Sequence, residues 1–253
     1  MIDKVVGSFD EAVSDMRDGA TLLIGGFGGF AECPSYLIAA VARKGVKNLT
    51  IVANSAGWGL EFRDQLVARM RPLLRYPEDY YDQGILIERG QVSKAIVSFA
   101  AAIGHVQTPL EKKAAAGEVE VELVPQGTMA ERIRAAKAGI PAFYSPVGAG
   151  TFTAQGKEVR QFDGRECVLE RAIRADYALI RAHRADRYGN LVYRGSTRTF
   201  NATMAGAARI TIAEVDEIVE LGELEAEHIV TPGVYVQRVV VRPSSPRPWN
   251  VPS

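Results

Sequence analysis

The sequence predicts an α/β fold: an open, mostly parallel β-sheet flanked by helices, with an added β-hairpin. Two short apolar runs, Leu22–Ile24 and Leu49–Ala53, are typical of strands buried on both faces. Each run ends in a loop of small residues, which indicates consecutive strand–helix units and therefore a parallel sheet with helices on both faces. Residues 159–169 contain two strand-like segments around Asp163-Gly164, a pair typical of two-residue hairpin turns.

The first elements are expected in the order helix, strand, helix, strand. A capping box at Ser8–Glu11 predicts the start of the first helix, and Gly19 its end. Pro34 suits the first turn of the second helix, because a missing N–H costs nothing there. That helix is expected to end at Gly45 and to bury one apolar stripe, formed by Leu37, Ile38 and Val41.

A glycine-rich loop joins the first strand to the second helix. It consists of Gly25, Gly26, Phe27, Gly28, Gly29, Phe30 and Ala31. Glycine has no Cβ, so backbone amides and the following helix N-terminus can bind an anionic or polarised oxygen; tight strand-to-helix corners also use glycine. No Gly-Lys-Ser/Thr follows, so the loop is not a P-loop. A dinucleotide site needs an acidic residue after the next strand, where Asn54 and Ser55 stand instead.

Two amide side chains stand at expected strand ends. Asn54 follows the strand at 49–53, and Gln126 lies between a strand end and a helix start. In sheets of this class, ligands bind at the carboxyl ends of the strands. The Gln126 amide can hold a carbonyl or a carboxylate, or it can cap local backbone, and the sequence supports both interpretations.

The remaining elements follow from apolar periodicity, capping residues and turn residues. In the first half we expect a helix at 60–70, a loop with three tyrosines at 73–82 and a strand at 95–99. A helix follows from a capping box at 108–111 to Gly117, and another from a capping box at 128–131 to Lys137. Between them we expect a half-exposed strand at 119–123, with Glu118, Glu120 and Glu122 on its solvated face. In the second half we expect strands at 142–144, 177–181, 191–193, 210–213 and 234–241, a small-residue loop at 145–151 and a short helix capped by Asn201. We expect one domain, residues 1–242, and a Pro-rich tail, residues 243–253.

Composition narrows the class of protein. Lys+Arg and Asp+Glu are balanced at 30 each among 253 residues, so nothing favours a nucleic-acid partner. No apolar run approaches the ~20 residues of a membrane span, and the N-terminus has no signal-like core. Two cysteines, Cys33 and Cys167, are too few for a disulfide framework, which fits a reducing cytosol. We therefore expect a soluble cytoplasmic protein with no membrane partner.

The chain offers no convincing nucleophile and base. Its histidines, His105, His183 and His228, lie far apart and in no metal-ligand spacing, so no metal site is expected. His183, among several arginines and beside Asp186, is the best candidate for a working histidine. Cys33, at a helix N-terminus, has no histidine close in sequence, and no Gly-x-Ser-x-Gly motif is present. The chain thus has a loop suited to binding an oxyanion but no convincing nucleophile. This combination predicts that the chain supplies only half of an active site.

Several motifs, spread over nearly the whole chain, carry a resemblance to a known family. They are Asp18-Gly19 with Ile24-Gly25-Gly26-Phe27, Val124-Pro125-Gln126-Gly127-Thr128 with Glu131-Arg132-Ile133-Arg134, Pro146-Val147-Gly148-Ala149-Gly150-Thr151, Ala178-Leu179-Ile180-Arg181-Ala182-His183-Arg184 with Gly189-Asn190-Leu191, and the segments 219–224, 229–233 and 236–240. In these motifs the sequence resembles the A (alpha) subunit of the family I 3-oxoacid CoA-transferases, the group of the succinyl-CoA:3-ketoacid, acetoacetate and 3-oxoadipate enzymes.

The resemblance implies an open α/β fold of the isomerase/CoA-transferase type, shared with ribose-5-phosphate and glucosamine-phosphate isomerases. It also implies a homologous B (beta) subunit, in a heterotetramer, that carries the catalytic glutamate, so no catalytic residue is expected in this chain. In the family mechanism that glutamate attacks an acyl-CoA thioester, forming an acyl-glutamyl anhydride and then an enzyme–CoA thioester, and the acceptor carboxylate takes the CoA. Coenzyme A is then a substrate, and no cofactor is expected.

By the same resemblance, residues that contact CoA or substrate are expected in the glycine loop, Gly25 to Ala31, and at Asn54, Gln126, Gly148 and Gly150.

Two departures from the family pattern lie near the expected acyl site. Ala31 replaces a family glycine, and two residues instead of one precede Pro34. The segment at 58–85 also exceeds the usual length between the second and third strands. We expect Glu32 or this tyrosine-rich insertion to change substrate choice, which a swap to the shorter family version would test.

The sequence leaves two alternative functions open. A related heteromer could hydrolyse an acyl-CoA instead of transferring the CoA, and free CoA released without a carboxylate acceptor would identify it. A non-catalytic sensor of acyl-CoA or sugar phosphate is the other alternative. The sequence shows no helix-turn-helix segment or basic arm, which counts against a regulator.

Overall fold

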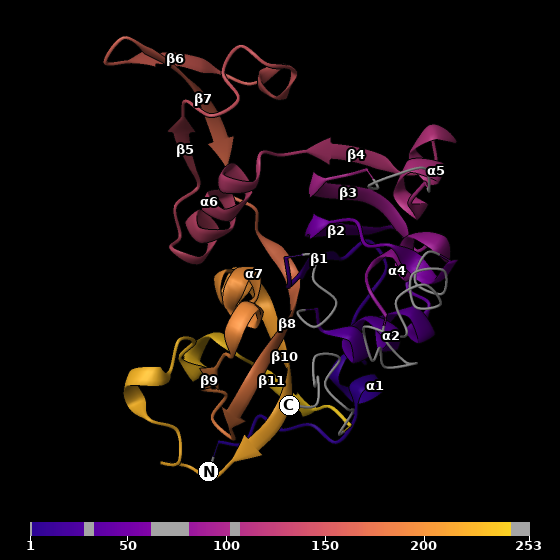
Figure 1. Ribbon diagram of the computed structural model, residues 1–253, viewed down its shortest axis with the longest axis vertical. Coiled ribbons are helices and arrows are strands. Elements are labelled where there is room, and N and C mark those ends of the chain that lie inside the picture. The colour runs from indigo at the N-terminus through magenta and orange to yellow at the C-terminus, as the bar shows by residue number, and fades with distance from the viewer. Residues whose placement is uncertain (1, 28–32, 62–80, 102–106, 244–253) are drawn as a thin grey trace, which may run out of the picture.

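The computed structural model describes residues 2–27, 33–61, 81–101 and 107–243. Its main sheet has the strand order β11-β10-β8-β1-β2-β3-β4, and each neighbouring pair in this order is parallel (Figure 1). The strands are β1 Thr21–Ile24, β2 Leu49–Ser55, β3 Val92–Phe99, β4 Glu120–Leu123, β8 Ala175–Asp186, β10 Ala208–Val219 and β11 Arg238–Val241, with β9 Leu191–Val192 antiparallel to β8. The predicted open and mostly parallel sheet is confirmed.

Helices cover both faces of this sheet. They are α1 Phe9–Ala12, α2 Ser35–Lys44, α4 Gly84–Glu88, α5 Pro109–Ala115, α6 Gln126–Lys137 and α7 Thr199–Met204, with short 3-10 turns η1 Phe152–Ala154, η2 Gly195–Arg198, η3 Ala226–His228 and η4 Gly233–Tyr235. Strand β1 lies between two cores because successive side chains of a strand point to opposite faces. Leu22 and Ile24 pack in the core of α1, α2 and α4, whereas Leu23 packs in the core of α6 and α7.

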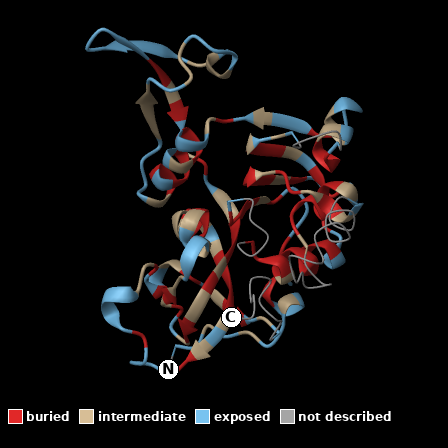
Figure 2. Ribbon diagram, viewed as in Figure 1, coloured by how far each residue is buried: buried red, intermediate tan, exposed pale blue. Residues whose placement is uncertain are grey.

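A second, antiparallel sheet projects from the main body (Figures 1 and 2). It has the order β5-β7-β6, with β5 Ala142–Ser145, β6 Val159–Phe162 and β7 Arg165–Arg171. Asp163 and Gly164 have φ angles of 49° and 76°, as a two-residue hairpin turn requires at both central positions. The predicted hairpin is confirmed, and the strand expected at 142–144 joins it rather than the main sheet.

Several expected boundaries were wrong. The helix that Ser8 caps ends at Ala12 instead of Gly19, and α6 begins at Gln126 instead of after Thr128. Strands β8 and β10 are much longer than expected, so His183 lies within β8. Asn201 lies inside α7 and does not cap it. The capping box at Thr108 is confirmed, and the expected helix at 60–70, loop at 73–82 and tail at 243–253 lie largely outside the described residues.

The glutamates in and just before β4 do not form a uniformly solvated face. Glu122 is half-buried and accepts from Arg132 Nη1 at 2.7 Å, with Lys94 Nζ at 3.3 Å. Val121 and Leu123 are instead exposed at this edge of the sheet. The Arg132 guanidinium also donates to the Arg171 carbonyl, so this ion pair ties α6 to both sheets.

Among the helices that the structure describes, none is long and apolar enough to cross a membrane.

Candidate functional site

The end of β1 forms a tight turn at the carboxyl edge of the main sheet. Gly25 N donates to the Leu179 carbonyl at 2.9 Å, and Gly26 has a φ of 107°, a conformation that favours glycine. Phe27 follows with 47% of its surface exposed. The remaining loop residues expected to contact ligand, Gly28, Gly29, Phe30 and Ala31, and the neighbouring Glu32, lie outside the described residues.

Two amide side chains connect this turn to α6. Asn54 Nδ2 donates to the Phe27 carbonyl at 2.5 Å, and Gln126 Nε2 donates to Asn54 Oδ1, also at 2.5 Å. Asn54 is 7% exposed near the end of β2, and Gln126 is exposed in the first turn of α6. The structure thus brings three of the predicted site residues together. We call Phe27, Asn54 and Gln126 the amide chain.

The amide chain places Gln126 where negative charge is favoured. A side-chain amide nitrogen carries two hydrogens, and the bond to Asn54 uses one of them. The first N–H groups of a helix have no partner within the helix and carry a partial positive charge. Gln126 opens the twelve-residue helix α6, so its amide lies beside such a terminus. The arrangement can stabilise a developing oxyanion.

The N-terminus of α2 is not available to a ligand in the way the sequence indicated. The N–H groups of Tyr36 and Leu37 donate to Glu214 Oε2 at 2.9 and 3.2 Å. Glu214 lies on β10 and is fully buried. Burial raises the pKa of this carboxyl, and the charges of Arg242 and Arg181 oppose that shift. An internal carboxylate therefore occupies the position expected for a bound anion.

His183 belongs to a charged group beside Glu214. Its Nδ1 lies 3.0 Å from Asp216 Oδ2, and Arg181 Nη2 donates to Asp216 Oδ1 at 3.1 Å. Burial pushes the pKa of Asp216 up, but Arg181, the bond to His183 and Arg242 lower it overall. His183 thus takes part in this ionic group and not in the amide chain. A charge within the apolar run of β10 is the sequence signal that could have revealed Glu214, because buried charges need partners.

Gly148 and Gly150 lie in the loop that follows β5. Both have positive φ angles, 85° and 71°, and a Cβ at Gly148 would lie 2.6 Å from Thr153 Oγ1. These glycines therefore shape a local turn. The loop belongs to the projecting sheet, so the structure does not bring them to the amide chain (Figure 1).

The two described ends of the long insertion meet beside α2. Asp82 is buried and accepts from the N–H groups of Trp58, Gly59 and Gly84; burial raises its pKa to about 6, and these bonds oppose the shift. Tyr81 N donates to Ser35 Oγ at 2.5 Å. The first and last described residues of the insertion therefore lie close together, next to α2, the helix that follows the glycine loop.

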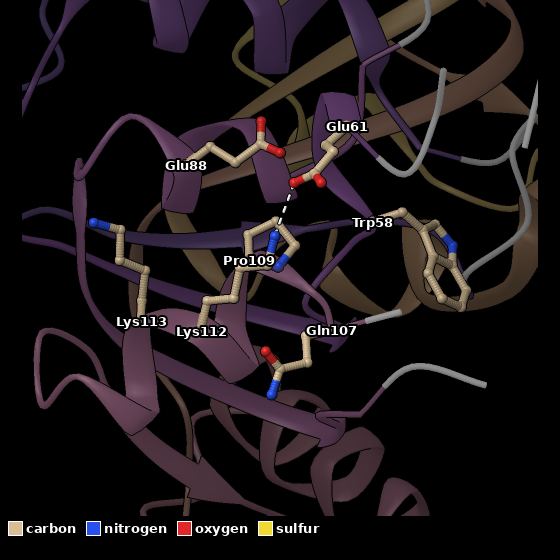
Figure 3. Close-up of a pocket in the computed structure, with 7 residues that line it drawn as sticks. All are labelled: Trp58, Glu61, Glu88, Gln107, Pro109, Lys112 and Lys113. Carbon is tan, nitrogen blue, oxygen red and sulfur yellow. Dashed lines mark hydrogen bonds and ion pairs between the residues drawn. The ribbon is translucent and has the colours of Figure 1, made fainter. Parts of the chain in front are cut away.

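A cavity of about 170 Å³ lies next to this junction (Figure 3). Its lining residues are Trp58, Glu61, Glu88, Gln107, Pro109, Lys112 and Lys113. Lys112 Nζ donates to Glu61 at 2.8 Å, and Glu88 accepts from Leu60 N at 2.9 Å, so these charged groups already have protein partners. No residue of the amide chain lines this cavity. Within the described residues, no group of three or more His, Cys, Asp or Glu side chains could hold a metal ion.

Comparison with known proteins defines the class to which this fold and site belong. The sequence profile of the coenzyme A transferase family matches residues 6–70 and 77–242. The chain belongs to the coenzyme A transferase family.

Within that family, the chain is similar to proteins named as A subunits, as two relatives illustrate. The chain is 44% identical over 238 residues to the A subunit of succinyl-CoA:3-ketoacid coenzyme A transferase from Helicobacter pylori strain J99, covering 94% of this chain and 92% of the relative. It is 45% identical over 241 residues to the A subunit of 3-oxoadipate CoA-transferase from Pseudomonas putida, covering 95% and 94%. The designation of these relatives as A subunits implies a second kind of subunit.

Solved structures agree on the fold. An acyl-CoA transferase from Escherichia coli O157:H7, in a thioester complex with CoA, is 25% identical and superposes with a TM-score of 0.79 over 98% of this chain. This chain spans 49% of that longer chain. Glutaconate coenzyme A-transferase from Acidaminococcus fermentans is 20% identical and superposes with a TM-score of 0.75, covering 95% of this chain and 76% of the other.

Proposed function

We propose that this chain is the A subunit of a heteromeric acyl-CoA:carboxylate CoA-transferase that acts on a 3-oxoacid or a related short or medium acid. The observation that carries the proposal is the amide chain at the carboxyl edge of the main sheet. Family membership supplies the reaction class, and the names of the 43–46% identical relatives favour a 3-oxoacid.

Gln126 is the oxyanion donor in this proposal. The second hydrogen of its Nε2 donates to the thioester carbonyl oxygen of the acyl-CoA as that oxygen gains negative charge. Asn54 holds the amide orientation because its oxygen accepts from Gln126 while its nitrogen donates to Phe27. Phe27, half exposed on the turn, offers an apolar surface to the acyl or pantetheine part of the substrate.

The attacking carboxylate comes from a homologous B subunit, and the two chains form a heterotetramer. The cytoplasm is the proposed location: the thiols of Cys33 and Cys167 are both buried and neither is in a disulfide, which fits a reducing compartment. Gly28 to Ala31 and the loop with Gly148 and Gly150 contact CoA only in the assembled enzyme. The domain is residues 1–242, followed by a separate tail.

Co-expression with the reading frame next to this gene tests the proposal. The purified complex is incubated with succinyl-CoA or acetyl-CoA, with and without a 3-oxoacid acceptor. Formation of the 3-oxoacyl-CoA, dependent on both chains and on the acceptor, is expected. Release of free CoA without an acceptor would identify a hydrolase instead, and no acyl-CoA chemistry by the complex would contradict the proposal.

Replacing Gln126 by alanine is expected to lower kcat about 100-fold, because one oxyanion donor is lost. The KM for acyl-CoA should change little, since the bond strengthens only in the transition state. Steady-state kinetics of the complex measures both constants. Gln161→Ala, which removes an exposed amide from β6, is the matched control. A kcat for Gln126→Ala equal to that of the control would contradict the assignment of Gln126.

A further inference from the structure

The side chain of Asn201, on α7, lies directly against the backbone of Gly25 at the end of β1. A Cβ built on Gly25 would lie 1.8 Å from Asn201 Oδ1 and 2.7 Å from Asn201 Cγ. The amide of Asn201 therefore fills the space that a side chain at position 25 would need. Gly25 precedes Gly26 and Phe27, so Asn201 packs directly against the start of the turn that carries the amide chain.

Asn201 is itself held on two sides. Its Oδ1 accepts from Arg181 N at 2.8 Å, and its Nδ2 donates to the Thr197 carbonyl at 2.9 Å. The side chain is fully buried. A buried amide is costly unless it is hydrogen-bonded, and asparagine is a poor residue for a helix interior. The role of Asn201 thus lies in these tertiary contacts rather than in the stability of the short helix α7.

The neighbouring residue holds the other end of the turn. The rings of Phe200 and Phe27 stack with centroids 6.4 Å apart and an interplanar angle of 23°. Phe200 is 6% exposed and belongs to the core beneath α7, whereas Phe27 is half exposed. Helix α7 therefore contacts the turn at its first residue through Asn201 and at its third through Phe200.

These contacts lead to Gln126 through the amide chain. The Phe27 carbonyl accepts from Asn54 Nδ2, and Asn54 Oδ1 accepts from Gln126 Nε2. If the Phe27 carbonyl shifts, Asn54 loses its acceptor and its amide can rotate. Gln126 then loses the acceptor that orients it.

We propose that Asn201 and Phe200 are positioning residues for the oxyanion donor Gln126, acting through the turn at Gly25–Phe27 and through Asn54. This inference rests on the proposed function of Gln126. It gives α7 a role in the reaction through its contacts with the turn at Gly25–Phe27.

A double-mutant cycle in the co-expressed complex tests the proposal, because it measures whether two residues act together. Asn201→Ala is expected to lower kcat about tenfold in the wild-type background, as a small displacement of a catalytic group does, with the KM for acyl-CoA nearly unchanged. In the Gln126→Ala background the same substitution should lower kcat by less than about twofold, since no oriented donor remains. Thermal unfolding is recorded for all four proteins.

Two further variants keep the test decisive. Phe200→Leu preserves the apolar core but removes the ring stacked on Phe27; it should show the same coupling and replaces Asn201→Ala in the cycle if that variant does not assemble. Thr231→Ala is the control for loss of a buried hydrogen bond, because fully buried Thr231 bonds to Tyr193 at 2.8 Å, away from the turn. It should lower stability without coupling to Gln126.

The outcomes separate the two claims. If Gln126→Ala lowers kcat but Asn201→Ala and Phe200→Leu lower it equally in both backgrounds, or not at all, the positioning role is wrong and the proposed function stands. If Gln126→Ala leaves kcat unchanged, the proposed function of Gln126 fails first.

Discussion

Replacing Gly25 by alanine is expected to lower the unfolding free energy by about 3 kcal/mol, the upper part of the range for inserting atoms into a packed core. The reason is steric, because the added Cβ would lie 1.8 Å from Asn201 Oδ1, and Asn201 is held by bonds to β8 and to the turn before α7. Chemical denaturation measures the loss. Activity should fall with it, since the turn and the amide chain must move.

Two matched variants separate this clash from a general effect of alanine. Gly127→Ala adds a Cβ in the first turn of α6, where nothing lies within 4 Å, and alanine favours a helix. It should be neutral or stabilising. Adding Asn201→Ala to Gly25→Ala should recover part of the lost stability because the obstructing amide is gone. Equal losses for Gly25→Ala and Gly127→Ala would show that the close approach of Asn201 does not decide the effect.

Glu214→Ala is expected to lower the unfolding free energy by about 3 kcal/mol, because removing one partner of a buried ionic group leaves uncompensated polar groups. The N–H groups of Tyr36 and Leu37 lose their acceptor, and Arg242, with an 11% exposed side chain, loses a neighbouring charge. For a chain of this size the midpoint of thermal unfolding should drop by roughly 10 °C. Differential scanning calorimetry measures it.

Glu220→Ala is the control for that substitution. Glu220 follows the same strand, but its side chain is 77% exposed and lies 3.8 Å from Arg187. Exposed ion pairs contribute little, so the midpoint should hardly change. Glu214→Gln should fall between the two, because an amide oxygen still accepts an N–H bond but carries no charge. A midpoint for Glu214→Ala close to that of Glu220→Ala would contradict the buried ionic account.

Local chemistry made much of the fold predictable. The apolar run before Gly25, the capping box at Thr108 and the Asp163-Gly164 turn each act over a few residues, and the structure confirms all three. Asn54 and Gln126 could be placed at one edge because parallel strands end on the same side of a sheet. Their direct hydrogen bond could not be predicted, since it joins residues 72 positions apart.

The errors arise where distant parts of the chain satisfy polar groups. Strand β8 extends past Arg181 and His183 because charged side chains of β8 and β10 pair with one another, as Arg181 does with Asp216. Because these residues are charged, a search for apolar runs does not detect this part of the strand. Asn201 has the residue type of a helix cap, but its bond to Arg181 places it inside α7. The anion site expected at α2 is filled by Glu214, which lies 178 residues beyond Tyr36.

The central claim is that this polypeptide contributes the oxyanion donor of the active site, while another chain contributes the reacting carboxylate. The complex is incubated with acyl-CoA, the enzyme–CoA thioester is trapped with borohydride, and the reduced residue is located by peptide mass spectrometry. We predict that the reduced glutamate lies on the partner chain in every preparation, and that Gln126→Ala lowers the rate at which it is labelled. A reduced glutamate on this chain, or full exchange by this chain without a partner, would contradict the account.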